Sequence, residues 1–359
     1  AAQSDAAEVQ KAGYSPGPSL INRKGGMILQ CVSVSPRDAE KAIRSLRSAG
    51  LLAAAKPLRK GDGVEIPVTD AARASQLLES LGIGHKVCTD HFEARTYTIR
   101  LSELTGLSGF LKIGPIVVFN YSRGVPIDKY VVAAEEVARA YRDVRSVFLK
   151  LGTTGELRLP QLVLLYGDGI TEAEVKENGL KFKLDVSRVY YNPRLSGERA
   201  RVASLAKDGE KGLDMFSGVA PFSITIASRA KAEVLSVDIN PYAAYYASVN
   251  VEDNRRRLKG DVEVLRADAR RLPELVDESF DRIIMNNPTA SVEFLDAACR
   301  LASKGASIHI YVLSTSEELA VNRVLGSGCT KEIAVVGRKR VLEYSPSSSV
   351  YVVDLKVLS

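Results

Sequence analysis

Tryptophan is absent from the 359-residue sequence, and it has only four cysteines and three histidines. Without tryptophan, any stacking on a nucleotide base must use tyrosine, phenylalanine or arginine. The cysteines are scattered and form no CxxC pair, and no histidines stand at the spacing of a zinc site. This pattern argues against structural zinc and against a disulfide framework. We therefore expect reduced cysteines in or near hydrophobic cores, namely Cys31, Cys88, Cys299 and Cys329.

Long hydrophobic runs are also lacking. No apolar segment approaches the roughly 20 residues that cross a bilayer, and no signal-peptide pattern opens the sequence. The hydrophobic fraction of 45% and the charged fraction of 26% are typical of a folded globular protein. These features predict a cytoplasmic protein with no membrane partner, and we expect it to be a monomer.

The charge is positive on balance. A net charge of +6 and a pI of about 9.0 favour a polyanionic partner such as nucleic acid. Two basic clusters, at 255–257 and 338–340, are candidate phosphate contacts. They are equally well explained as solvated surface, so the sequence leaves both interpretations open.

The hydrophobic pattern divides the sequence into four segments. Residues 1–26 are small, polar and aperiodic, which predicts a flexible extension. Residues 27–92 alternate strand and helix patterns in a small α/β module, whose first helix is expected to be capped by Ser35 and to begin at Pro36. Residues 93–186 read as a second, central α/β domain. From residue 187 to 359, short apolar strands alternate with helices, which predicts a doubly wound, mainly parallel sheet with terminal antiparallel strands.

The segment LDMFSGVAPFSITIA (213–227) is the clearest local signal in this last domain. Asp214 ends a predicted strand, Gly218 permits a tight turn, and Pro221 opens a helix. In a doubly wound sheet such a loop holds a nucleotide at the carboxyl ends of the strands. The second glycine of a dinucleotide fingerprint is replaced by Ala220. Since a pyrophosphate needs that close approach and S-adenosylmethionine has no phosphate, the loop favours S-adenosylmethionine over NAD.

Two more acids follow at successive strand ends. Asp238 lies twenty residues after Gly218, where a carboxylate accepts both ribose hydroxyls. Asp268 lies one strand further, in position to meet the adenine amino group. Any one of these acids alone could be a helix cap or a surface charge, but three in order predict a cofactor site.

The fourth strand of this domain ends in MNNPTA (285–290). Asn286 and Pro288 would present acceptors beside the transferred methyl group. The motif is similar to the NPPY-type motif of amino-methyltransferases, where an aromatic residue stacks on a flipped base. Thr289 stands in the aromatic position, which argues against an exocyclic amine as the methyl acceptor.

The segments YYNPRLSGERARVA (190–203) and DMFSGVAPFS (214–223) closely resemble the archaeal and eukaryotic tRNA (guanine-37-N1)-methyltransferase family, which includes the wyosine-pathway enzymes. GELRLPQLVLLYG, ENGLKFKLDVSRVYY, MNNPTASVEFLD and ASIHIYV extend the resemblance, which covers about residues 27–359. It implies an N-terminal module that binds the tRNA elbow, a central domain that contributes to the active site, and a class I, Rossmann-like methyltransferase domain. The implied partner is tRNA, contacted at its elbow and its anticodon loop.

The resemblance also implies roles for particular residues. Glu198 matches the general base, and Arg158 matches an arginine that contacts the target guanine. A base is needed because guanine N1 carries a proton, and an arginine would stabilise the charge that develops on O6. The expected substrate-binding residues are Tyr190, Arg194, Arg199 and Asn286. The expected cofactor-binding residues are Asp214, Phe216, Gly218, Asp238, Asp268, Asn286 and Pro288.

Two departures from the family pattern bear on substrate scope. Asn287 stands where the family usually has an apolar residue, and Thr289 where it often has histidine. A wyosine intermediate at the same nucleoside is therefore kept as a further substrate. Two other functions are kept as alternatives: a wyosine-pathway aminocarboxypropyltransferase, and a noncatalytic tRNA-binding protein.

Overall fold

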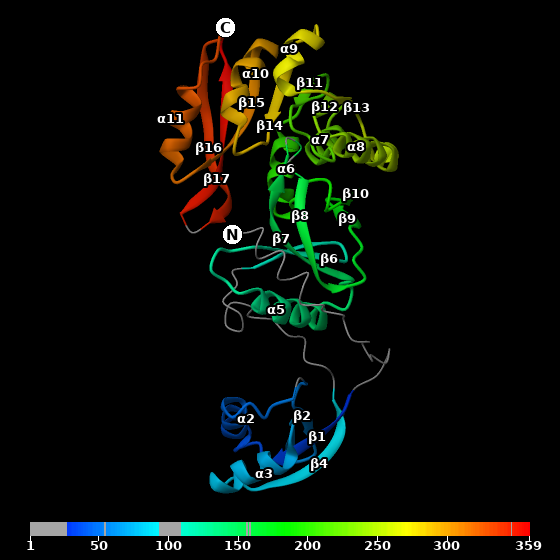
Figure 1. Cartoon of the computed structure of the whole chain (residues 1–359), viewed down its shortest axis with the longest axis vertical. Coiled ribbons are helices and arrows are strands. Elements are labelled where there is room, and N and C mark those ends of the chain that lie inside the picture. Colours follow the sequence, from blue (N-terminus) through cyan, green and yellow to red (C-terminus); the bar gives the residue numbers. More distant parts are fainter. Residues whose placement is uncertain (1–26, 54, 93–108, 156, 158, 346) are drawn as a thin grey trace. The chain divides into compact units, whose positions relative to one another are not determined.

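The computed structural model describes residues 27–53, 55–92, 109–155, 157, 159–345 and 347–359, and its contacts divide the chain into two compact units (Figure 1). The described part of the first unit is residues 27–92, and that of the second begins at residue 109. The predicted extension at 1–26 and the predicted active-site residue Arg158 lie outside the described residues.

The N-terminal unit is a four-stranded antiparallel sheet with two helices on one face. The strand order is β2-β3-β1-β4. Val32, Ile66, Leu46 and Leu78 meet in the core between this face and the helices. The elements are β1 (Met27–Val34), α2 (Ala39–Ser48), β2 (Leu58–Lys60), β3 (Gly63–Pro67), α3 (Ala71–Ser80) and β4 (His85–Phe92).

The first helix begins later than predicted. Ser35 Oγ donates to Asp38 Oδ2 at 2.8 Å, and the Asp38 amide donates back to Ser35 Oγ at 3.3 Å. These bonds close a turn before the helix, so α2 begins at Ala39 rather than at Pro36.

The prediction of reduced cysteines is wrong for the structure. Cys31 is joined to Cys88 and Cys299 to Cys329, with Cα–Cα distances of 4.8 and 5.8 Å. Each pair comes from separate elements, since 57 and 30 residues separate the partners. The spacing of the cysteines in the sequence therefore carried no signal of either pairing.

The second unit opens with a four-stranded sheet in the order β5-β6-β7-β8. β6 and β7 run parallel because α5 crosses between them, and the outer pairs are antiparallel. Tyr130, Ala133, Ala134 and Val137 line the buried side of the helix. The elements are β5 (Leu111–Ile113), β6 (Ile116–Asn120), α5 (Ile127–Ala140), β7 (Ser146–Thr154) and β8 (Leu159–Gly167).

A separate hairpin, β9 (Glu172–Glu177) and β10 (Leu180–Asp185), follows this sheet. Asn250 and Asn254 of helix α8 (Pro241–Asn254) hydrogen-bond the backbone of β10 at Lys183 and Lys181. The hairpin, expected in the central domain, is thus bound directly to a helix of the following domain.

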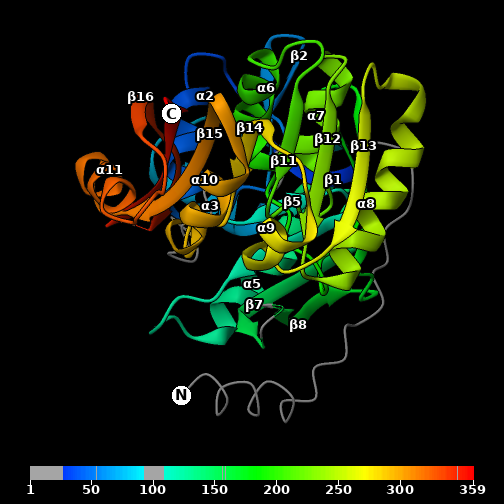
Figure 2. The same cartoon turned by 90° about the horizontal axis from the view of Figure 1, so that it is seen from above.

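The largest sheet has seven strands in the order β13-β12-β11-β14-β15-β17-β16. The first five are parallel, and β17 is antiparallel to both of its neighbours, β15 and β16. Figure 2 shows α8 beside β13 and α11 beside β16. The predicted fold class, a mainly parallel sheet closed by antiparallel strands, is confirmed. The strands are β11 (Lys211–Asp214), β12 (Glu233–Asp238), β13 (Asp261–Arg266), β14 (Phe280–Met285), β15 (Ala302–Ser314), β16 (Ile333–Ser345) and β17 (Ser348–Val357).

Helices cover both faces of this sheet. On one face, α6 and α7 pack over residues such as Ile284, Tyr311 and Val352. On the other, α9, α10 and α11 enclose a core that includes Leu213 and Ile310. No helix in the described ranges is long and apolar enough to cross a membrane. The helices are α6 (Ser196–Ser204), α7 (Pro221–Arg229), α9 (Leu272–Leu275), α10 (Leu295–Leu301) and α11 (Glu317–Leu325).

Candidate active site

The loop after β11 lies where the strand order reverses between β11 and β14. Such a switch point is the usual ligand crevice of an open α/β sheet. Gly218 has a φ of +56° and Ala220 a φ of +64°, and α7 starts at Pro221. The left-handed backbone at Ala220 costs an L-residue about 1–3 kcal/mol. The loop therefore makes the tight turn that a glycine-rich sequence would make, with a methyl group at its second bend.

Three buried polar atoms around this loop have no hydrogen-bond partner among the described residues: Asp214 Oδ1, Ser217 Oγ and Ser236 Oγ. Asp214 and Ser236 are register partners on β11 and β12. The other Asp214 oxygen accepts a 3.0 Å hydrogen bond from Ser223 of α7. Because a buried polar atom without a partner costs about 1–3 kcal/mol, this cluster is built for a polar ligand.

Burial raises the pKa of Asp214 to about 7, and the hydrogen bond from Ser223 only partly opposes this shift. The nearby charge of Asp238 acts in the same direction as burial. A hydrogen-bond donor on a bound ligand would therefore stabilise the charged form of the buried Asp214 carboxylate.

Asp238 ends β12 and ties two loops together. Its Oδ2 accepts from the Gly218 amide at 2.8 Å, and its Oδ1 accepts from the Asn240 amide at 2.9 Å. Burial raises the pKa of Asp238, and these amides oppose the shift. The carboxylate is therefore fixed beside the loop, and its role in holding a ribose stays a prediction.

Asp268, after β13, is held differently from the other two acids. Arg270 binds its carboxylate through Nε and Nη2, at 2.7 Å for Nη2 to Oδ2, and these bonds lower the pKa of Asp268. The Arg270 guanidinium also lies 5.8 Å from the ring centroid of Phe294, which packs edge-on against Phe216 at 4.9 Å. Asp268 and Phe216 thus belong to one cluster at the strand ends, and their contact with a cofactor stays a prediction.

The loop after β14 is a turn stabilised by Ser291. The Ser291 hydroxyl donates to the carbonyl oxygen of Met285 at 2.7 Å and accepts from the Asn287 amide at 3.0 Å. The Pro288 carbonyl accepts from the Leu313 amide at 2.8 Å. In the described structure the Asn286 side chain has no hydrogen-bond partner, which leaves its amide available to a ligand.

Tyr190 and Arg194 lie on the segment whose backbone passes beside the loop after β11. A Cβ on Gly218 would lie 3.5 Å from the carbonyl oxygen of Tyr190, so the backbone passes close to the loop. The Tyr190 side chain is 60% exposed, and its hydroxyl accepts from Asn192 at 3.2 Å. Arg194 is also exposed and donates to the carbonyl of Phe110 at 3.2 Å. Both side chains are accessible to a substrate.

Arg199 has a different environment. Its guanidinium is 2% exposed, binds both carboxylate oxygens of Glu177 and donates to the carbonyl of Asn192 at 3.1 Å. It also lies 5.2 Å from the ring centroid of Tyr191. The predicted substrate contact of Arg199 stays a prediction, and its observed contacts tie α6 to hairpin β9–β10.

Glu198 lies in the first turn of α6 and its side chain is 2% exposed. Arg201, one turn later, donates to both carboxylate oxygens, with Nη2–Oε1 at 2.6 Å and Nε–Oε2 at 2.9 Å. The Tyr311 hydroxyl of β15 donates to Oε1 at 2.8 Å, and the Tyr311 ring packs on Phe222 at the start of α7. Glu198 is therefore fixed next to the helix that follows the candidate cofactor loop.

These contacts continue into a longer chain of charged groups, which we call the Glu198 network: Glu198, Arg201, Tyr311, Asp354, His309, Arg282 and Glu210. Arg201 donates to Asp354 at 2.9 Å, and Asp354 accepts from His309 Nδ1 at 2.6 Å. Although burial opposes its charge, the hydrogen bonds that Arg201 donates to Glu198 and Asp354 raise the pKa of Arg201.

The network carries one net negative charge. Burial lowers the pKa of His309, so its imidazole is neutral at pH 7, with Nε2 facing Arg282 at 2.8 Å. Three carboxylates then face two guanidinium groups.

Sequence reasoning missed Tyr311, Asp354, Ser217 and Ser223. Tyr311 and Asp354 are separated from α6 by more than 100 residues, and only the sheet brings them together. The i, i+3 spacing of Glu198 and Arg201 was a visible signal of their ion pair.

Taken together, the strand order, the switch-point loop and the acids that end β11 and β12 and follow β13 define a class I, Rossmann-like methyltransferase domain. The chain matches the sequence profile of the TRM5/TYW2 methyltransferase domain over residues 173–335.

Named relatives agree with this class. Over 234 residues the chain is 35% identical to the tRNA (guanine(37)-N(1))-methyltransferase Trm5b of Pyrococcus abyssi, a match that covers 62% of this chain and 68% of the relative. It is also 30% identical over 254 residues to a tRNA(Phe) (4-demethylwyosine(37)-C(7)) aminocarboxypropyltransferase of Pyrococcus horikoshii. This match covers 69% of this chain and 88% of the relative.

A solved structure of a complex of aTrm5 and tRNALeu superposes with a TM-score of 0.65 at 25% identity, over 91% of this chain and 99% of that one. The chain belongs to the TRM5/TYW2 methyltransferase family, and the resemblance noted in the sequence is confirmed.

Proposed function

We propose that this protein transfers a methyl group from S-adenosylmethionine to N1 of guanosine 37 in tRNA, the nucleoside 3′ of the anticodon. The observation that carries the proposal is Glu198, a buried carboxylate held by Arg201 and Tyr311 at the start of α6, beside the loop after β11. The relatives named as guanine-37-N1-methyltransferases support it.

The residues around the switch point fit S-adenosylmethionine, which supplies an electrophilic methyl group when bound. The orphaned Asp214 and Ser217 atoms offer polar contacts, and Asp238 offers a carboxylate for the ribose hydroxyls. Phe216, Asp268 and Pro288 complete the proposed cofactor contacts. The methyl group of Ala220 fits a cofactor without phosphate, because a pyrophosphate needs the closest backbone approach at this turn.

Glu198 would accept the proton of guanine N1. N1 is a poor nucleophile while protonated, and a positioned base contributes about 10²–10⁴-fold to such a transfer. As Glu198 becomes neutral, Arg201 keeps a carboxylate partner in Asp354, at 2.9 Å. The ion pair lost on protonation is therefore partly replaced within the network.

The guanine itself would be held by groups from both sides of the crevice. Asn286 has a free amide, and Tyr190 exposes a ring on which a base can stack. Arg194 is placed to meet a phosphate or a base edge. Arg158 would stabilise the charge that develops on O6.

For the rest of the chain we propose the division implied by the family: 27–92 binds the tRNA elbow, 93–186 contributes to the active site, and 187–359 carries the chemistry. The N-terminal sheet and its helices form a compact unit of their own, which supports a separate role for residues 27–92. A monomeric state, a cytoplasmic location and a wyosine intermediate as a second substrate stay predictions.

The principal alternative is aminocarboxypropyl transfer from the same cofactor, as named for the relative from Pyrococcus horikoshii. The match of Glu198 to the general base of the guanine-37-N1-methyltransferases favours methyl transfer, as do the relatives named for that reaction. A noncatalytic tRNA-binding protein is disfavoured by the intact loop and strand-end acids.

The by-product separates these functions. We expect S-adenosylhomocysteine after incubation with S-adenosylmethionine and unmodified tRNA, analysed by mass spectrometry. Methylthioadenosine would establish the aminocarboxypropyl reaction instead, and neither product, with tRNA bound, would establish a binding protein.

A further inference from the structure

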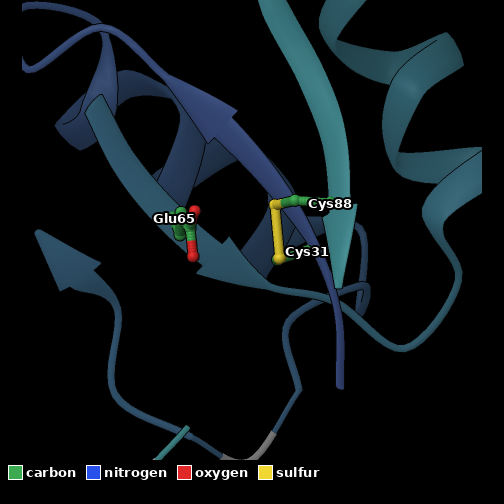
Figure 3. A group of neighbouring side chains, drawn as sticks. All are labelled: Cys31, Glu65 and Cys88. Carbon is green, nitrogen blue, oxygen red and sulfur yellow. A yellow bond between two sulfur atoms is a disulfide. The ribbon is translucent and has the colours of Figure 1, made fainter. Parts of the chain in front are cut away.

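The N-terminal sheet has a second face, opposite the one covered by α2 and α3. Cys31 of β1, Cys88 of β4 and Glu65 of β3 lie together on it (Figure 3). Cys31 is fully buried, and Cys88 and Glu65 are partly buried. None of these residues belongs to the candidate active site.

Strand register brings the three side chains together. Cys31 and Cys88 are direct partners across β1 and β4, and β3 pairs with the other edge of β1. The two sulfur atoms and a carboxylate oxygen of Glu65 all lie within 4.8 Å of one another. Three paired strands therefore place the two disulfide sulfurs and one carboxylate close together.

One oxygen of the Glu65 carboxylate lacks a partner there, although the group also faces Asp90. Its Oε2 is shielded from solvent and has no hydrogen-bond partner in the described part of the chain. The nearby ammonium group of Lys60 binds Asp90 instead. Since a buried carboxylate oxygen without a partner is costly, the disulfide form leaves this corner of the fold unsatisfied.

We propose that Cys31, Cys88 and Glu65 form a redox-gated site for a divalent cation of the zinc type. Two thiolates and one carboxylate are a ligand set that Zn²⁺ accepts, with water in the fourth position of a tetrahedron. The disulfide is the closed form of the site, because its sulfurs have no charge to offer a metal.

Opening the site requires a reductant, which we take to be a dithiol. The dithiol gives two electrons and two protons to the Cys31–Cys88 disulfide and becomes a disulfide itself, leaving two thiols on the protein. The cation then displaces the two thiol protons and binds two thiolates and the Glu65 carboxylate. Exchange with a small-molecule disulfide, which accepts the two electrons and two protons and leaves as two thiols, re-forms the Cys31–Cys88 bond and releases the cation.

The second disulfide provides an internal control. Among the residues that the structure describes, no group of three potential ligands includes Cys299 or Cys329. Reduction of that pair should therefore yield two thiols without a metal site.

The test is a titration of the full-length, reduced protein with Co²⁺, which reports thiolate ligation by its charge-transfer and d–d absorption. We expect one equivalent to bind, Zn²⁺ to displace it, and the oxidised protein to give no band. Cys31→Ser should abolish the band, and Glu65→Gln should weaken Co²⁺ binding by at least about tenfold. The Cys299→Ser, Cys329→Ser variant should bind like wild type.

Circular dichroism of each variant confirms that the fold is intact. No thiolate band in reduced, folded wild type would overturn the proposal and leave the pair a simple disulfide. A band that survives Cys31→Ser, or that disappears with the Cys299 pair, would overturn the assignment of the site. Unchanged affinity in Glu65→Gln would remove Glu65 from it. All of these readouts are independent of methyl transfer.

Discussion

Glu198 accepts three hydrogen bonds in the structure, two from Arg201 and one from Tyr311. Because Glu198 is already held in place, it loses little orientational freedom when the substrate binds. However, Arg201 and Tyr311 occupy the same carboxylate oxygens that must accept the proton. The Glu198 network resolves this conflict because Arg201 has Asp354 as a second partner.

Tyr311→Phe tests this positioning. The substitution removes one hydrogen bond to a charged group and keeps the ring on Phe222, so we expect kcat to fall by about 10- to 100-fold, in line with about 1.5–3 kcal/mol. KM for tRNA and cofactor affinity should not change. Tyr351→Phe, on the adjacent strand β17, is the matched control. A drop in cofactor affinity as large as the drop in kcat would indicate a general structural role for Tyr311.

Asp214 gives a pH-dependent stability. Because burial raises its pKa to about 7, the folded protein keeps this proton at pH values where the unfolded chain has already lost it. Unfolding between about pH 4 and 7 then releases a proton, so the free energy of unfolding falls as pH rises through this window, by a few kcal/mol in total.

Asp214→Asn should reduce the decrease in the free energy of unfolding between about pH 4 and 7. At pH values above 7 the variant should have a higher Tm than wild type, as measured by thermal unfolding without cofactor over pH 4–8. Exposed Asp277→Asn is the control and should leave the pH dependence as in wild type. The assignment fails if the Asp214 variant shows the same slope as wild type.

At the residue scale, the sequence predicted the strand-end acids because each follows an apolar strand directly, as at Asp214 and Asp238. It did not predict what holds Glu198. The partners Tyr311 and Asp354 come from β15 and β17, and only pairing in the sheet places them over α6.

Among the elements, the Cys299–Cys329 disulfide links α10 to the segment that precedes β16. Closing a loop of this length stabilises a fold by about 2–4 kcal/mol. It therefore holds the α10–α11 side of the sheet together.

In a Cys31→Ser, Cys88→Ser background, which leaves only this disulfide, a thiol reductant should lower the Tm by about 5–10 °C. Adding Cys329→Ser should abolish the response to reductant, measured by thermal unfolding. If the reductant leaves the Tm of the background variant unchanged, the Cys299–Cys329 disulfide contributes no stability.

Element boundaries were predicted where a residue type marks them, as at Asp214, which ends β11, and at Pro221, which begins α7. They were missed where side chains bond locally, since the Ser35–Asp38 turn delays α2. The disulfides were missed because strand register, which opposes Cys31 to Cys88, does not appear in residue spacing.

The whole molecule carries a net charge of +6, which bears on its partner. Binding of a polyanion by lysine and arginine releases counterions and weakens with salt, whereas S-adenosylmethionine has no phosphate. Raising salt from about 50 to about 200 mM should lower tRNA affinity at least about tenfold. Cofactor affinity should stay nearly constant. Both affinities can be measured by fluorescence titration. If tRNA and cofactor affinities fell equally with salt, the positive charge would not serve tRNA binding.

The most direct test of the central claim is methyl transfer from labelled S-adenosylmethionine to tRNA transcripts with G or A at position 37, by wild type and Glu198→Gln. N1 methylation with Glu198 as the base predicts label on the G37 transcript alone, and its loss in the variant, with tRNA and cofactor still bound by the variant. Label on both transcripts, or full activity in Glu198→Gln, would contradict N1 methylation of guanosine 37 with Glu198 as the base.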